Sequence, residues 1–353
     1  VEQLPGGPNV PGDVTVSSFS SWGPTDDGRV KPDIMGMGDV VYSTSTGSTS
    51  SYNYLSGTSM ATPNVTGSLL LLQEYYAQKH NDSVMRSATL KGLACHTAFD
   101  AGNVGPDYKY GWGLLDMRKA ANAIGSDGTN GNIMQLSLQQ GQSQIYTVVS
   151  KGGEPLTTTV AWTDPEGVTP PYGTVNDRTP KLVNDLDVRI SDEATVYNPW
   201  VLSPENPAAP ATTGDNIRDN IEQVRINNTT AGKTYTITIS HKGLLKNGGQ
   251  DYSLIVSGGS INGSSSASTE KVLSAFPTPA NDLLTVLFKV KKAGVLKMSL
   301  VNMSGRMVYS TERNAPAGNF NTQLDVTNIP TGVYALRIVS ASKVYSQKVF
   351  IVK

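Results

Sequence analysis

The chain has 353 residues, enough for two or three domains, and only 16% of them are charged, with a formal net charge of −1. These values exclude a generally basic nucleic-acid-binding protein and an acidic disordered chain. The single cysteine, Cys95, excludes an internal disulfide framework, and the apolar run Leu69 to Leu72 is far shorter than the ~20 residues that a membrane-spanning helix needs.

The charge is divided unevenly along the chain. Residues 1–271 hold 18 Lys and Arg against 26 Asp and Glu, whereas residues 272–353 hold 10 against 3. Opposite signs indicate separate modules with separate tasks. The chain begins at Val1 without a signal-peptide pattern, which we expect of a processed product or a fragment.

Residues 1–128 are predicted to mix helix and loop in one domain. The clearest helix runs from Ser59 to about His80, where apolar residues recur at helical spacing and Pro63 suits the first turn. Asn81 and Asp82 end it, and two shorter helices are expected over Val84 to Ala94 and Met117 to Ile124.

Residues 129–258 alternate between apolar and polar side chains with the period of a β-strand. The predicted strands are Gln144 to Val149, Thr157 to Trp162, Asp185 to Ile190, Thr234 to Ser240 and Tyr252 to Val256. Strands of this number, separated by Pro- and Asn-rich loops, favour an all-β sandwich or jelly roll. Residues 259–270, rich in Gly and Ser, are expected to be a flexible linker.

Residues 271–353 again show short alternating runs, which fit a small antiparallel, immunoglobulin-like sandwich. We therefore expect a multidomain chain with an α/β part, a jelly roll and a final β-sandwich that folds on its own.

Ser59 stands at the predicted start of a helix, in the segment Ser56-Gly-Thr-Ser-Met-Ala-Thr-Pro. A serine hydroxyl becomes a nucleophile when a base takes its proton and the site stabilises the oxyanion. Free amides and the positive dipole end of a helix can do the second task. The structural alternative is that Thr58 or Ser59 only caps the helix.

The segment Gly57-Thr-Ser-Met-Ala-Thr-Pro resembles the nucleophile motif of the subtilases, the subtilisin-like serine peptidases. Three further segments resemble other parts of that domain in the expected order, namely Ser17-Ser-Phe-Ser-Ser-Trp-Gly-Pro, Lys31-Pro-Asp-Ile-Met and Tyr110-Gly-Trp-Gly-Leu-Leu-Asp. The resemblance covers about Val14 to Ala123 and implies that Ser59 is the nucleophile, with its own N–H in the oxyanion hole. Gly36-Met-Gly replaces the usual Ala-Pro-Gly.

The rest of a subtilase triad is missing from this sequence. In that family both the aspartate and the histidine precede the serine, but the 58 residues before Ser59 contain no histidine. His80 lies 21 residues along the same helix, roughly 32 Å away at 1.5 Å per residue. His96, beside Cys95, and His241 are expected to be packing or loop residues. The base and acid are therefore expected from upstream sequence or a separate chain, unless the protein is an inactive relative.

Two segments of the middle region, Leu182-Val-Asn-Asp-Leu-Asp-Val and Asn220-Ile-Glu-Gln-Val, resemble the jelly-roll domain that follows the catalytic domain in a group of alkaline subtilases. Carboxylate and amide oxygens gather in this region. Asp185 and Asp187 share one face of a predicted strand, and Asn184 and Asp164 could add oxygens, so that a structural Ca²⁺ site is predicted here. The alternative is a solvated polar face.

The C-terminal region carries four motifs in order, Phe276-Pro-Thr-Pro-Ala-Asn-Asp, Val301-Asn-Met-Ser-Gly-Arg, Ile329-Pro-Thr-Gly-Val-Tyr and the ending Lys348-Val-Phe-Ile-Val-Lys. They resemble the type A sorting domain of the type IX secretion system of Bacteroidota. That resemblance implies export through the outer membrane by this machinery, and release or attachment at the cell surface. The excess of Lys and Arg suits docking to an anionic surface.

The sequence therefore predicts the C-terminal portion of a secreted subtilisin-like serine endopeptidase, which acts on protein or peptide substrates through Ser59 and is inactive as this chain alone. The alternative is a cell-surface binding or adhesin-type protein on a degenerate subtilase scaffold. Cleavage preference is not predicted.

Overall fold

The computed structural model describes residues 7–130, 132–267, 273–277, 279–302, 304–340 and 343–353. It divides the chain into two compact units, Val1–Ala267 and Ser268–Lys353. The regions predicted as separate domains over residues 1–128 and 129–258 lie together in the first unit. Among the described residues, no helix is both long and apolar enough to cross a membrane.

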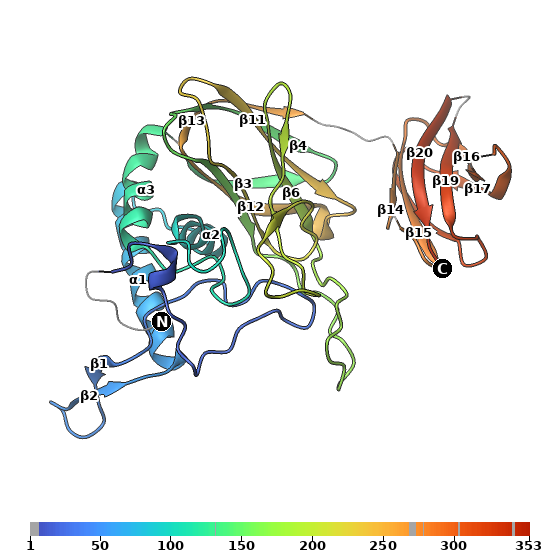
Figure 1. The fold of residues 1–353 in the computed structure, drawn as a ribbon. Coiled ribbons are helices and arrows are strands. Elements are labelled where there is room, and N and C mark those ends of the chain that lie inside the picture. Colours follow the sequence, from blue (N-terminus) through green and yellow to red (C-terminus); the bar gives the residue numbers. More distant parts are fainter. Residues whose placement is uncertain (1–6, 131, 268–272, 278, 303, 341–342) are drawn as a thin grey trace. The chain divides into compact units, whose positions relative to one another are not determined.

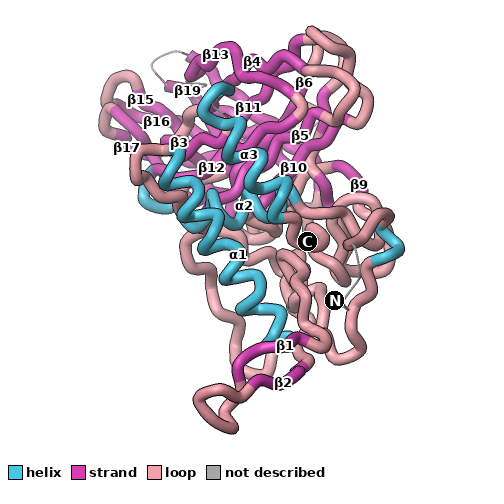
Figure 2. The backbone as a smooth tube through the Cα atoms, turned by 90° about the vertical axis from the view of Figure 1, so that its left-hand side faces the viewer, coloured by secondary structure: helices cyan, strands magenta, loops and turns pink. Residues whose placement is uncertain are grey.

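The first unit contains three helices, α1 (Thr58–Lys79), α2 (Ser87–Thr97) and α3 (Met117–Asn130). They lie side by side along one flank of the unit (Figures 1 and 2). Helix α2 begins three residues later than predicted because the Gln73 side chain holds Met85 in the preceding segment, accepting from its N–H at 2.9 Å and donating to its carbonyl oxygen at 2.8 Å. Apolar side chains between the helices form a small core that includes Leu72, Tyr76, Leu93, Ala120 and Ile124.

Two larger antiparallel sheets stand beside the helices in the first unit (Figure 1), which also has the two-stranded sheets β1–β2 (Val41–Thr44 and Tyr52–Leu55) and β8–β9 (Trp200–Val201 and Thr212–Thr213). Of the larger sheets, one has the strand order β10-β5-β12-β3 and the other the order β13-β4-β11-β6-β7. The strands are β3 (Ile133–Gln139), β4 (Ser143–Ser150), β5 (Leu156–Trp162), β6 (Asp185–Ser191), β7 (Val196–Tyr197), β10 (Ile221–Ile226), β11 (Thr234–Lys242), β12 (Gly249–Ser257) and β13 (Gly259–Ala267). Both sheets contribute to one apolar core, in which Leu156, Val160 and Leu254 meet Val188, Ile190 and Ile237. The two sheets thus form a sandwich; burial alternates along β4 and β11, whereas every residue of β5 is buried.

The structure corrects the linker expected over residues 259–270. Residues Gly259–Ala267 form β13, which pairs antiparallel with β4, so that most of the predicted linker belongs to a sheet. A Cβ atom on Gly259 would lie 2.7 Å from Cγ2 of Val148, and the partly buried Ile261 packs against the sandwich core. The Gly-rich composition reflects close strand packing rather than flexibility. Residues 268–270 lie outside the described residues.

Helix α2 joins the helical part to the sandwich. Gly92 lets the helix approach β5 closely, because a Cβ there would lie 2.9 Å from Cβ of Ala161. The buried hydroxyls of Thr89 and Ser253 (β12) lie 2.7 Å apart. These contacts explain why the two regions fold as one unit.

The second unit has two antiparallel sheets, β14-β15-β18 and β17-β16-β19-β20. Their strands are β14 (Leu273–Phe276), β15 (Leu283–Val290), β16 (Gly294–Asn302), β17 (Met307–Ala315), β18 (Gly318–Asp325), β19 (Gly332–Ser340) and β20 (Lys343–Ile351). Its core is drawn from its own residues, among them Leu284, Val286, Leu300, Leu336 and Val349.

Candidate functional site

Ser59 is the second residue of α1, and the loop before the helix fits tightly against its first turn. The N–H of Gly57 donates to the Gly38 carbonyl oxygen at 2.7 Å. A Cβ on Gly38 would lie 2.8 Å from Cβ of Ala61, and one on Gly36 would lie 2.5 Å from Cγ2 of Val65. The two glycines of the Gly36-Met-Gly segment are therefore needed for packing, and they fix where the helix begins.

The Ser59 side chain is exposed at the N-terminus of α1. The N-cap is Gly57, which has no side chain, and its carbonyl oxygen accepts from the amides of Met60 and Ala61 at 3.0 and 3.2 Å. Neither Thr58 nor Ser59 therefore caps the helix. The amides of Thr58 and Ser59, the first two of the helix, have no preceding turn to which they can donate, so they and the helix dipole favour negative charge beside Ser59.

None of the three histidines lies near Ser59. His80 closes the far end of α1, where its Nδ1 lies 2.9 Å from the Tyr76 carbonyl oxygen and its Nε2 lies 2.9 Å from Oδ2 of Asp127. Nε2 of His241 accepts from the amide of Gly141 at 2.7 Å. His80 thus makes structural contacts far along α1, as the spacing predicted, whereas His241, predicted as a loop residue, lies within strand β11.

His96 also lies away from Ser59, at the end of α2. Its Nδ1 lies 2.8 Å from Oγ1 of Thr159 and its Nε2 lies 3.0 Å from Oγ of Ser257. Burial, with a smaller effect of Arg225, lowers the pKa of His96 to about 4. Burial also raises the pKa of the neighbouring Cys95, whose thiol is almost wholly covered. The thiol therefore stays protonated, and Cys95 and His96 are not a nucleophile–base pair.

Asp185 and Asp187 contact an ammonium group in this structure. Nζ of Lys242, on the neighbouring strand β11, lies 3.2 Å from Asp185, 2.9 Å from Asp187 and 2.8 Å from Asp215. Burial raises the pKa of Asp185 to about 6 despite Lys242. Burial by itself would lower the pKa of Lys242, but the charges of Asp187 and Asp185 raise it by more. Lys242 therefore stays cationic.

Asp164 and Asn184 are engaged elsewhere and do not complete a metal site. The Asp164 carboxylate accepts from the amides of Val183 and Asn184, each at 2.8 Å. The Asn184 amide group donates to Gln250 at 2.6 Å. Within the described ranges, no group of three or more His, Cys, Asp or Glu side chains is arranged to hold a metal ion. The four residues as arranged do not fit Ca²⁺, so the calcium prediction needs a direct test.

Glu222, on β10 of the opposite sheet, completes this charged cluster and was not singled out from the sequence. Its side chain is 0% exposed, and Oε2 accepts from the Val188 amide at 2.8 Å and lies 3.7 Å from Nη1 of Arg189. Oε1 has no hydrogen-bond partner among the described residues. Burial, reinforced by the charge of Asp187, raises the pKa of Glu222 well above its usual value.

Glu222→Gln is expected to stabilise the first unit at neutral pH. A carboxyl whose pKa is raised by folding adds stability below its unfolded pKa and loses it as the pH rises through its folded pKa. The free energy of unfolding should therefore rise at pH 7.5, where the glutamate must be either charged in the core or protonated against the solution pH, and stay unchanged near pH 4. Thermal unfolding at both pH values measures this, with exposed Glu193→Gln as the control. Equal effects at both pH values would contradict it.

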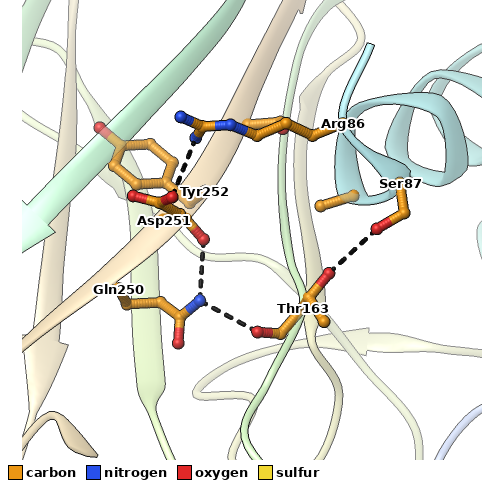
Figure 3. Close-up of a pocket in the computed structure, with 8 residues that line it drawn as sticks. Arg86, Ser87, Thr163, Gln250, Asp251 and Tyr252 are labelled. Atoms are coloured by element: carbon orange, nitrogen blue, oxygen red, sulfur yellow. Dashed lines mark hydrogen bonds and ion pairs between the residues drawn. The ribbon is translucent and has the colours of Figure 1, made fainter. Parts of the chain in front are cut away.

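A cavity of about 260 Å³ lies between the start of α2 and the strand β12. Figure 3 shows that its polar side chains contact one another or the backbone. Arg86 lies 3.6 Å from Asp251, Gln250 donates to the Thr163 and Asp251 carbonyl oxygens, and the Ser87 hydroxyl lies 3.3 Å from that of Thr163. None of the predicted site residues lines this cavity, so Ser59 remains the candidate catalytic residue.

Comparison with known proteins identifies two regions of the chain. Residues 12–113 match the Subtilase family, and residues 274–353 match the Secretion system C-terminal sorting domain. These matches confirm the two resemblances. The chain thus contains a subtilase region, which includes Ser59, and ends in a type IX sorting domain, which implies secretion or display at the cell surface in Bacteroidota.

Several curated proteins are similar to parts of the chain. The serine protease/ABC transporter B family protein tagD of Dictyostelium discoideum is 27% identical over 259 residues, 54% of this chain and 14% of that protein. The autotransporter lipoprotein NalP of Neisseria meningitidis is 44% identical over 72 residues, 20% of this chain and 6% of NalP. The C5a peptidase of Streptococcus pyogenes is 45% identical over 67 residues, 19% of this chain and 6% of that enzyme. The chain thus spans at most 14% of the length of these three relatives.

Among solved structures, a glycosyl hydrolase family 2 member from Bacteroides cellulosilyticus is similar over 59% of this chain and 28% of its own, at 9% identity and a TM-score of 0.17. A score this low carries no argument about fold or function.

Proposed function

We propose that this chain supplies the nucleophile-bearing part of a secreted serine endopeptidase, whose base and acid come from polypeptide outside these 353 residues. One observation carries the proposal: in a region that matches the Subtilase family, Ser59 is exposed at the start of α1, while the three histidines of the chain contact Asp127, Thr159 and Gly141. Sequence similarity to the C5a peptidase of Streptococcus pyogenes covers 19% of the chain.

In this proposal, Oγ of Ser59 bonds to the carbonyl carbon of a peptide bond while its proton passes to the external base. The amides at the start of α1 stabilise the negative charge on the carbonyl oxygen. The C–N bond then breaks, the amine leaves with that proton, and water releases the acyl group. In this reaction the chain itself positions Ser59 and stabilises the oxyanion.

The other parts of the chain support this role in different ways. We assign the two-sheet part of the first unit to a jelly roll that holds the helical part through α2, and the second unit to an immunoglobulin-like sandwich that the secretion machinery recognises. The partners are then a peptide substrate and the type IX machinery.

Covalent labelling tests the proposal. A fluorophosphonate should modify Ser59 when the base and acid are present and should leave this chain unmodified when it is alone. A non-catalytic surface protein, the competing function, would not be labelled in either form.

The calcium prediction has its own test. If Ca²⁺ binds near Asp185 and Asp187, a chelator should lower the melting temperature of the first unit, because a ligand that binds only the folded state stabilises it. Because Lys242 already neutralises these carboxylates, we expect the melting temperature to be unchanged by the chelator. A drop that the double change of both aspartates to Asn abolishes would establish a calcium site.

A further inference from the structure

The basic residues of the second unit gather at one end of its sandwich, where β15 passes into β16. Residues 273–353 hold ten Lys and Arg against three Asp and Glu. Six of the ten lie at this end, which we call the basic end: Lys289, Lys291, Lys292, Lys297, Arg313 and Lys343. Of the acidic residues only Glu312 lies there, whereas Asp282 and Asp325 lie at the other end of β15. The C-terminus, which follows β20, is at that other end too (Figure 1).

The register of the strands brings the members of the basic end together. Gly294, at the start of β16, pairs with Ala315, at the end of β17. Because β16 also pairs antiparallel with β19, the end of β19 lies at the same place, and there Ser340 pairs with Lys343, the first residue of β20. In the other sheet, β15 ends where β18 begins. Neighbouring strands are about 4.8 Å apart, so four strand ends span roughly 15 Å. The basic end is therefore one compact surface.

Most of this positive charge is exposed. The exposed members are Lys291, Lys292, Lys297, Arg313 and Lys343. Nζ of Lys297 lies 2.9 Å from the Glu312 carboxylate, which offsets one of the positive charges. The remaining excess attracts anions, and it favours a surface that presents many of them at once over a single small anion.

Two exposed apolar side chains lie among the basic ones. Val295, near the start of β16, and Val344, near the start of β20, are 49% and 52% exposed. Val339 pairs with both Lys297 and Val344, so these three side chains share the outer face of the sheet. Basic side chains around apolar ones are typical of proteins that lie on a lipid surface, because the cations contact phosphates while the apolar groups enter the interface. A free phosphate ion would match the charge alone.

We propose that the basic end binds the anionic phospholipid headgroups of a membrane surface and holds the sorting domain against it. This inference rests on the sorting role of the second unit, because export brings that unit to the outer membrane. It adds a partner to that role. Lys291 and Lys292, on the turn between the two sheets, contact the phosphates, and Val295 and Val344 enter the headgroup layer.

Co-sedimentation of the whole chain with vesicles tests the proposal. The vesicles contain phosphatidylcholine alone or with one third phosphatidylglycerol. The chain should bind only the anionic vesicles, and high salt should release it because salt screens exposed charges. Changing Lys291, Lys292 and Lys343 to Gln should weaken binding by about a hundredfold, because each basic residue near an anionic membrane contributes about a fivefold gain.

The matched control removes the same charge from the second unit outside the basic end. Changing Arg306, Arg337 and Lys348 to Gln should weaken binding by a few-fold at most. The melting temperature of each variant shows whether it folds. If the triple variant at the basic end folds poorly, Lys292→Gln on the turn keeps the test decisive, because this single change should still cost about fivefold in binding.

Three results would overturn the inference. Equal losses in the two triple variants would show that net charge, not its position, causes binding. Displacement of the chain from vesicles by inorganic phosphate at the same phosphate concentration would indicate a site for a free anion. An unaltered chain that ignores anionic vesicles, while the change at the basic end still blocks export, would make a protein of the export machinery the partner. Vesicle binding together with export of a protein that lacks residues 268–353 would instead refute the sorting role and leave the lipid contact established.

Discussion

Ser59→Ala is expected to abolish fluorophosphonate labelling of the complete protein and to lower its peptide turnover by about 10⁴-fold or more. The reagent forms a bond only to a serine whose proton a base can take, and Ser59 is exposed at the N-terminus of α1 within the region that matches the Subtilase family. The isolated chain should stay unlabelled, because its histidines contact Asp127, Thr159 and Gly141 instead.

The matched control is Thr58→Ala, one residue away in the same turn. It removes a hydroxyl without touching the nucleophile, and the Thr58 carbonyl oxygen that accepts from Oγ1 of Thr62 remains. Mass spectrometry of the labelled peptide locates the modification. Strong, site-specific labelling of the isolated chain would show that the base lies within the 353 residues, and turnover that survives Ser59→Ala would show that another residue is the nucleophile.

The sequence was most informative where a short segment determines its own structure. The predicted start of α1 differs from the observed one by a single residue, because Gly57 is the N-cap and fixes the start locally, whereas Pro63, predicted in the first turn, lies inside the helix. The residues around Ser59 carry a motif, so their family could be identified before the structure was known, and the family match agrees.

The sequence was least informative where partners lie far apart in the chain. Asp185 and Asp187 suggested a cation, but nothing near them indicated that Lys242, more than fifty residues later, provides it. Glu222 reaches the same cluster from the other sheet, at a position that reads as an ordinary strand residue. A pairing that depends on how strands are ordered in a sheet leaves no local signal.

The β1–β2 hairpin and β13 were missed for a related reason. Residues 41–55 are rich in Ser and Thr, which indicate loops by composition. Tyr42, Tyr52 and Tyr54 come together only because β1 and β2 pair. Gly259–Ala267 has the composition of a linker, but its backbone hydrogen-bonds to β4. Backbone hydrogen bonding at a sheet edge requires little of the side chains, so composition could not distinguish an edge strand from a loop or linker.

Deleting residues 268–353 is expected to abolish export and to leave the first unit folded with its labelling intact. The second unit matches a secretion sorting domain, and its two sheets and its core contain no strand from residues 1–267. Its 11 basic residues against 4 acidic ones suit recognition by an anionic surface of the export machinery. The truncated protein should therefore collect in the periplasm at wild-type melting temperature, as cell fractionation and thermal unfolding would show.

A second deletion with a different starting residue tests whether the loss of stability comes from β13 or from the second unit. A deletion that begins at residue 259 also removes β13, which exposes the edge of β4 and the apolar groups that Gly259 and Ile261 cover, so it should lower the melting temperature of the first unit as well. Fusing residues 268–353 to a fluorescent protein should carry it to the cell surface in a host that has the secretion system. Efficient export of the shorter protein would remove the sorting role. An equal loss of stability in both deletions would show that the second unit supports the fold of the first, because an independent module is not needed for its neighbour's stability.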